Sequence, residues 1–137
     1  MKRKVSKKDI RRIEWAIGWH FGIDDEYAEK EKILSDNSLE ILIERNKKKE
    51  IVAYLIFLEY TTHIEGIRSG VFRDYRGQGL SKKLYKRLMR IAKLRKKPYK
   101  TYTHYTNIKS INAHISAGMR LYHADAKQGW VYLISDT

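Results

Sequence analysis

The chain has 137 residues of ordinary globular composition, which predicts a single domain (residues 1–137) with one hydrophobic core. It has no cysteine, which excludes disulfides and thiol nucleophiles, and its net charge is +13. The basic N-terminus lacks the apolar core of a signal peptide, and the longest apolar run, Ile51–Leu58, is too short to cross a bilayer. We therefore expect a cytoplasmic protein without a membrane segment.

The N-terminal half predicts two helices followed by three strands. Apolar residues spaced by three and four predict a helix from Asp9 to about Gly22, and a stretch rich in Glu and Lys predicts a shorter helix over Asp24–Ser35. Alternating and continuous apolar runs then predict strands over Leu39–Arg45, Glu50–Tyr60 and His63–Phe72.

The C-terminal half predicts a helix, a strand, a second helix and a hairpin. A stripe of Leu84, Leu88, Ile91 and Leu94 predicts an amphipathic helix from Leu80 to about Lys97, which Pro98 stops. A strand over Tyr99–Thr106, a helix between the caps Asn107 and Gly118, and a hairpin turning near Lys127–Gly129 follow. The order predicts an α/β (α+β layered) fold with a mainly antiparallel twisted sheet flanked by helices.

The positive charge is concentrated in one segment. Residues 75–124 contain no Asp or Glu but hold 13 of the 29 basic residues, so this segment carries the whole excess. Such a field attracts polyanions such as nucleotide phosphates, nucleic acid or anionic lipid. The alternative is a solvated helix face that only keeps the protein in solution.

A glycine-rich turn precedes the basic helix. Arg76-Gly77-Gln78-Gly79 stands where a strand ends and a helix begins at Leu80 or Ser81. The first turn of a helix presents unpaired amide groups and the positive end of the dipole, and glycines let a phosphate approach them. The alternative is a tight turn without a ligand. The spacing of a Walker loop is absent.

These motifs resemble the GNAT superfamily of acetyl-CoA-dependent N-acetyltransferases. The family signature Gln/Arg-x-x-Gly-x-Gly/Ala matches Arg76–Ser81, with Ser81 in place of the usual Gly or Ala, and Val71 stands five residues ahead as in the family. The family's Asn followed by a short helix and Gly-Phe is similar to Asn107 and Gly118-Met119. The resemblance covers about Leu39 to Thr137 and implies a splay between the family's fourth and fifth strands.

The resemblance also implies how acetyl-CoA, as co-substrate, is held. The backbone around the glycine turn would cradle its pyrophosphate, with Lys82 or Lys83 reaching a phosphate. Backbone groups of Ile67–Val71 would run along pantetheine, the Val71 N–H would donate to the thioester carbonyl, and Asn107 would bind pantetheine from the other strand. The implied pyrophosphate residues are Arg76, Gly77, Gln78, Gly79, Leu80 and Ser81.

Attack of an amine on a thioester needs a base, a stabilised oxyanion and a proton for the sulfur. Glu65 stands where several family members keep a general base, and strand alternation predicts that it shares a face with Val71. His63, two residues earlier, is a predicted substrate contact that could share this task. His114 replaces the family's usual proton-donating tyrosine, and our hypothesis makes it the acid. The alternatives are a surface carboxylate and a partly buried histidine.

The acceptor is less well defined by the sequence. In the family the first two helices border the acceptor pocket, so Trp19, His20 and Tyr27 are candidates for substrate contact, with the core as the alternative. Tyr99, Tyr102 and Tyr105 could stack on a base or simply belong to a half-buried strand. Without an HExxH motif or paired carboxylates, no metal site is expected.

Three functions remain open. The first is transfer of an acetyl group to an amine of a small molecule or protein, by direct attack in a ternary complex. The second is acyl transfer to nucleic acid or a nucleic-acid-bound target, suggested by the basic segment 75–124. The third is a non-catalytic domain that binds coenzyme A or a polyanion. The sequence also leaves a homodimer open.

Overall fold

The structure, a computed structural model, describes residue 13 and residues 40–135. The predicted helices over Asp9–Gly22 and Asp24–Ser35 lie outside the described residues, except that Ile13 is helical and fully buried.

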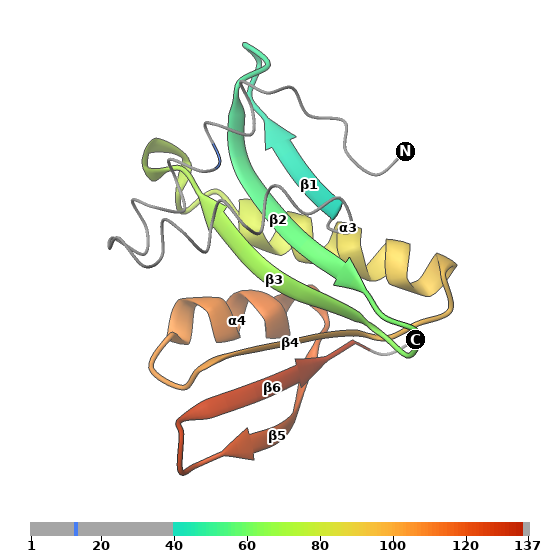
Figure 1. The fold of residues 1–137 in the computed structure, drawn as a ribbon. Coiled ribbons are helices and arrows are strands. Elements are labelled where there is room, and N and C mark those ends of the chain that lie inside the picture. Colours follow the sequence, from blue (N-terminus) through green and yellow to red (C-terminus); the bar gives the residue numbers. More distant parts are fainter. Residues whose placement is uncertain (1–12, 14–39, 136–137) are drawn as a thin grey trace.

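The described chain forms one six-stranded sheet in the order β1-β2-β3-β4-β6-β5 (Figure 1). All neighbouring strands are antiparallel except β3 and β4, which are parallel. The prediction of an α/β fold with a mainly antiparallel sheet is thus confirmed. The strands are β1 (Glu40–Arg45), β2 (Ile51–Glu59), β3 (Ile64–Val71), β4 (Tyr99–His104), β5 (Arg120–Asp125) and β6 (Trp130–Ile134); a 3-10 turn η1 (Arg73–Tyr75) and helices α3 (Leu80–Leu94) and α4 (Ile108–Ala117) connect them.

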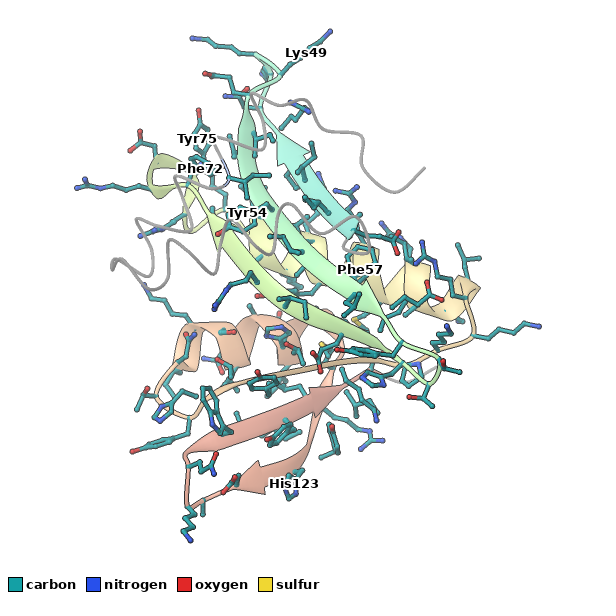
Figure 2. The ribbon with its side chains drawn as sticks, viewed as in Figure 1. Lys49, Tyr54, Phe57, Phe72, Tyr75 and His123 are labelled. Carbon is teal, nitrogen blue, oxygen red and sulfur yellow. The ribbon has the colours of Figure 1, made fainter. Side chains whose placement is uncertain are left out.

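The two faces of the sheet carry separate apolar clusters. On the face covered by α3 and α4, residues such as Leu55, Phe57 and Leu133 pack against the buried side of α3. On the other face, Tyr54, Ile56 and Phe72 pack with Ile13. Figure 2 shows Tyr54, Phe72 and Tyr75 gathered near the start of β2 and the end of β3, where η1 begins. β2 is buried on both faces from Ile51 to Phe57, as its continuous apolar run predicts.

The parallel strands β3 and β4 pair only at their first residues. Ile64 pairs with Tyr99 and Glu65 with Lys100, and no later residue of the described β3 pairs with β4. The two strands therefore diverge toward their C-terminal ends, which confirms the splay that the resemblance implies.

A β-bulge in β3 overturns one prediction. Gly66 pairs with Phe57 but Arg68 pairs with Ile56, so Ile67 is an extra residue. Since partners across the ladder share a face, Val71 lies with Ala53 on the α3 side, whereas Glu65 lies with Leu58 on the opposite side. The prediction that Glu65 and Val71 share a face is wrong, because one inserted residue reverses the alternation.

The helix α3 begins at Leu80, as predicted, but ends at Leu94 rather than near Lys97. Lys96 adopts φ 59°, a left-handed conformation that a continuing helix does not allow. Leu84, Leu88 and Ala92 form the buried stripe, while Leu94 is 83% exposed. The prediction that Leu94 faces the core is wrong, because the stripe follows the spacing of four and Leu94 falls on the outer side.

Carboxylates of β1 and β2 pair with part of the basic segment. Glu44 accepts ion pairs from Lys83 at 3.0 Å and Arg87 at 2.6 Å. At the other end of α3, Arg95 and Lys97 hold Glu59, at 2.6 Å in each pair, and Arg95 also pairs with the buried Glu40 at 2.8 Å. Four of the 13 cations of this segment thus tie α3 and the chain after it to the sheet. Because these four positive charges are paired, the segment attracts an outside polyanion less strongly than 13 unpaired cations would.

The helix α4 has the ends that its sequence predicts. The Asn107 side chain accepts a hydrogen bond from the Ser110 N–H, and Gly118 ends the helix with φ 115°. β5 and β6 then form the predicted C-terminal hairpin, with Gly129 in its turn at φ 81°. These caps place α4 across the open end of the splay, beside α3 (Figure 1).

Candidate active site

A cavity of about 410 Å³ lies in the splay between β3 and β4. Its wall includes four residues that the sequence analysis selected: Glu65, Ile67, Asn107 and His114. It also includes aromatic residues to which that analysis gave no firm role, namely Tyr85, Tyr99, Tyr102 and Trp130. Residues from four strands and both described helices therefore meet where the described sheet opens between β3 and β4.

The end of β3 turns backbone groups toward this opening. The Phe72 N–H donates to the Val52 carbonyl at 2.9 Å, which makes this a hydrogen-bonded pair of the antiparallel ladder. Such pairs alternate along a ladder, so the N–H and C=O of Ser69 and Val71 point away from β2, to the side that β4 has left. The Val71 carbonyl there accepts a hydrogen bond from Arg76 Nε at 3.1 Å. The Val71 N–H lies on the side where a thioester donor is expected.

The glycine turn has the geometry that an anion site needs. Gly77 and Gly79 adopt φ 79° and 75°, conformations that other residues rarely take, and Gly79 is the N-cap of α3. A Cβ at either glycine would meet no heavy atom within 4 Å. No side chain caps the helix start, and no acidic residue stands in its first turn. The amides of the first turn, Leu80 to Lys82, therefore lack a side-chain cap at the positive end of α3.

The charged groups around this turn have distinct partners. Arg76 closes the turn through its bond to Val71, while Gln78 is exposed and Ser81 is half-buried on the first turn of α3. Lys83 pairs with Glu44, so of the two lysines predicted to reach a phosphate Lys82 is the better placed. Phosphate groups of a coenzyme fit this turn because bare backbone, a helix start and cations coincide there.

His114 lies in the cavity wall, but as a neutral imidazole. It is 4% exposed, and burial lowers its pKa to about 4 despite a hydrogen bond to the Ser110 backbone. A carbonyl oxygen only accepts, so the 2.7 Å contact from His114 Nδ1 to Ser110 O places the proton on Nδ1. Nε2 then carries no proton at neutral pH. This protonation state argues against the hypothesis that His114 is the acid.

Tyrosine hydroxyls line the same wall. The Tyr85 ring stacks on His114 with centroids 3.7 Å apart, and its hydroxyl lies 3.2 Å from Ser69 Oγ. Burial raises the pKa of Tyr85, so the phenol keeps its proton. The fully buried Tyr99 packs its hydroxyl end against Gly66, where a Cβ would lie only 2.8 Å from that oxygen. Sequence patterns placed Tyr85 only within the helix and gave it no role.

The remaining predicted residues are distributed around the cavity. Glu65 lies in the wall, on the sheet face opposite α3 and α4. His63 belongs to the β2–β3 turn, where its ring stacks on Tyr60 at 4.9 Å, and it is not part of the wall. Trp19, His20 and Tyr27 lie outside the described residues.

The described part of the chain shows neither a candidate metal site nor a helix that could span a membrane. Residues 13 and 40–135 contain no group of three His, Asp or Glu side chains that could hold a metal ion. Among the helices of these residues, none is both long and apolar enough to cross a membrane.

A mixed sheet that opens between two parallel strands, with a glycine turn leading into a helix at the opening, is the arrangement of an acyl-CoA-dependent N-acyltransferase. The sequence profile of the Acetyltransferase (GNAT) family matches residues 7–119. The chain therefore belongs to the GNAT family, and it is an acyl-CoA-dependent N-acetyltransferase with acetyl-CoA as co-substrate. No match was found among curated protein sequences.

Solved structures share the whole fold at low sequence identity. One is the PaiA N-acetyltransferase from Thermoplasma acidophilum in complex with coenzyme A (16% identity, 98% of this chain and 97% of that chain covered, TM-score 0.74). Another is the ribosomal-protein-S18-alanine N-acetyltransferase from Escherichia coli (14%, 97% and 90%, TM-score 0.75). A third is a mutant of the spermidine N-acetyltransferase SpeG from Vibrio cholerae (13%, 97% and 92%, TM-score 0.72). At these identities the likeness shows the fold alone.

The neutral state of His114 predicts an acid-sensitive fold. Unfolded chains bind a proton on this histidine below about pH 6.5, but the folded chain does so only near pH 4. Stability therefore falls as the pH drops from 6.5 to 4, by about 2 kcal/mol between pH 7 and 4.5. Urea unfolding at both pH values should show this loss in the wild type and a loss smaller by that amount in His114→Gln. An equal pH dependence in both proteins would contradict the neutral assignment.

Proposed function

We propose that the protein transfers the acetyl group of acetyl-CoA to a primary amine by direct attack within a ternary complex. The observation that carries this proposal is the cavity in the splay, which brings backbone donors, a carboxylate and a phenol to one opening. No cysteine exists to form an acyl-enzyme thioester, which favours direct attack over a cysteine-linked intermediate.

In this proposal the coenzyme enters along the open side of β3. Its pyrophosphate rests on the amides that begin α3, between Arg76 and Lys82, and its pantetheine arm pairs with the outward backbone of Ser69 and Val71. Asn107 faces the arm from the other side, where its Oδ1 already caps α4 and its Nδ2 supplies donors. The Val71 N–H donates to the thioester carbonyl and stabilises the oxyanion that develops there.

Glu65 is the proposed general base. It lies in the cavity wall on the sheet face away from α3 and α4, so an acceptor that approaches from this face meets the thioester and the carboxylate together. Amines are mostly protonated at neutral pH, so a carboxylate at this position removes the proton that blocks attack.

Tyr85 is the proposed proton donor to the departing thiolate, in place of His114. It stays protonated because burial raises its pKa, and it lies in the wall directly on the His114 ring. The neutral imidazole holds that phenol in place and offers no proton of its own from Nε2.

The acceptor is an amine of a small molecule or of a protein. The SpeG relative is named for spermidine and the E. coli relative for an alanine of a ribosomal protein, so the fold accommodates both kinds. A nucleic-acid-bound acceptor has less support, because Lys83, Arg87, Arg95 and Lys97 are engaged with carboxylates of β1 and β2.

Replacing the proposed base tests the function most simply. Glu65→Gln should lower kcat/KM at pH 7 by about 100-fold, because general bases contribute that much or more, and the loss should shrink as rising pH deprotonates the amine. Initial rates of CoA release across pH 6–10 measure it. Glu50→Gln, in the β1–β2 turn, is the control and should leave the profile unchanged. An unaltered profile for Glu65→Gln would remove this residue from the mechanism.

The proton donor is tested by removing a single oxygen. Tyr85→Phe keeps the ring stacked on His114 but deletes the phenol, so kcat should fall about 10- to 100-fold while KM for acetyl-CoA changes little. His114→Gln, which removes a group without a proton on Nε2, should lower kcat less. Full kcat in Tyr85→Phe, or a much larger loss in His114→Gln, would return the acid role to the histidine.

A further inference from the structure

An aromatic surface adjoins Glu65 on the sheet face away from α3 and α4. Glu65 is in register with Lys100, and alternation along β4 puts Tyr102 on this face as well. Tyr102 pairs with Tyr132 of β6, and the Tyr122 ring of β5 packs on Tyr132. We call Tyr102, Tyr122, Trp130 and Tyr132 the aromatic face.

The rings of this face form one continuous cluster. The Tyr132 centroid lies 5.7 Å from Tyr102 and 6.3 Å from Tyr122, and Trp130 meets Tyr102 edge-on at 5.3 Å. Tyr102 and Tyr122 are 49% and 44% exposed, so large parts of two rings remain open to a ligand. The Tyr132 ring also lies 5.2 Å from that of His123 of β5, which Figure 2 shows far from Tyr54 and Phe72.

The aromatic face is continuous with the cavity. Tyr102 and Trp130 belong to the cavity wall together with Glu65. Partial burial, and after it the nearby Tyr132 and Glu65, raise the pKa of Tyr122, which places Tyr122 within electrostatic reach of Glu65. A molecule lying on Tyr102 and Tyr122 therefore has its near end at the proposed base.

The charges around the face select against a polycation. Lys100 Nζ already lies 5.9 Å from the centre of the Tyr122 ring, where a ligand cation would otherwise sit. The chain carries a net charge of +13, and β4 and β5 up to residue 124 belong to the acid-free segment. A second carboxylate, Asp125, is paired with Trp130 at the hairpin turn, where it accepts a hydrogen bond from the Gln128 N–H. Beside Glu65, a second ligand cation would meet repulsion from Lys100, whereas an uncharged ring would not.

We propose that the acceptor is a primary monoamine borne on an aromatic ring, which stacks on Tyr102 and Tyr122 while its amine reaches Glu65. This inference rests on the proposed function for the fate of the amine, but the ring preference can be measured without turnover. Aromatic pairs of this kind strengthen binding by about 2- to 10-fold beyond the effect of buried area.

The experiment compares two amines of the same length and charge, 2-phenylethylamine and 2-cyclohexylethylamine, with spermidine as the polycation. Calorimetry on the full chain saturated with CoA gives each Kd. We expect the phenyl compound to bind about 5-fold or more tightly than the cyclohexyl compound, and spermidine to bind more weakly than either. Tyr102→Leu and Tyr122→Leu should each reduce the phenyl preference. Tyr105→Leu, at a 58% exposed tyrosine outside the cavity wall, is the matched control and should keep it.

Equal affinities for the two ring systems, tighter binding of spermidine, no binding of any amine, or a phenyl preference that survives in both variants would overturn the inference. Unchanged acetyl-CoA affinity verifies that each variant is folded. Acetyl transfer to both ring amines at equal efficiency and equal Kd would leave the proposed function standing and remove the ring preference. A clear phenyl preference in binding without any acetylated product would support the ring preference and contradict the proposed acetyl transfer.

Discussion

The register between β3 and β4 is the constraint on which the site depends, because only two residue pairs join these parallel strands. Beyond Glu65 and Lys100 the strands separate, and the backbone of β3 that a continuing strand would have satisfied faces a cavity instead. Buried backbone groups without partners are costly, so an opening of this kind is stable when water or a ligand supplies the missing hydrogen bonds. The two amide groups of an extended pantetheine arm can make the hydrogen bonds that a neighbouring strand would otherwise make.

The surrounding structure keeps this opening in place from both ends. At its base, the Tyr99 N–H donates to Ser135 Oγ at 2.9 Å, which anchors the start of β4 to the end of β6. At its mouth, the start of α3 is tied to β1 by the ion pairs of Lys83 and Arg87 with Glu44, so the helix start stays over the end of β3. The same ion pairs engage basic residues, which are then less available to attract a polyanion.

Local signals in the sequence predicted most of the framework, since each depends on neighbouring residues. Asn107 and Gly118 cap a helix wherever their surroundings allow one, and the glycines at 77 and 79 marked a left-handed turn before α3. The bulge at Ile67 was not predictable, because it depends on how β2 and β3 are aligned and leaves no mark in the composition of the strand. It moved Glu65 to the face opposite Val71.

The chemistry of individual side chains was harder to predict than their positions. The motif placed His114 at the site, but its protonation depends on the Ser110 carbonyl one turn earlier in α4 and on burial under Tyr85, which only the packing of α3 against α4 provides. The aromatic face likewise needs β4, β6 and β5 side by side, and β6 follows β5 in the chain but lies between β5 and β4 in the sheet. Trp130 and Tyr132 therefore could not be connected with Glu65 before the strand order was known.

The central claim, that acetyl-CoA completes the open side of β3, is tested most directly by amide hydrogen exchange with and without saturating acetyl-CoA. We expect slowed exchange at Ser69 and Val71 and at the amides of residues 77–82, with little change in the β1–β2 turn at residues 46–50. Unchanged exchange at these amides in the bound protein, or protection confined to other elements, would contradict it.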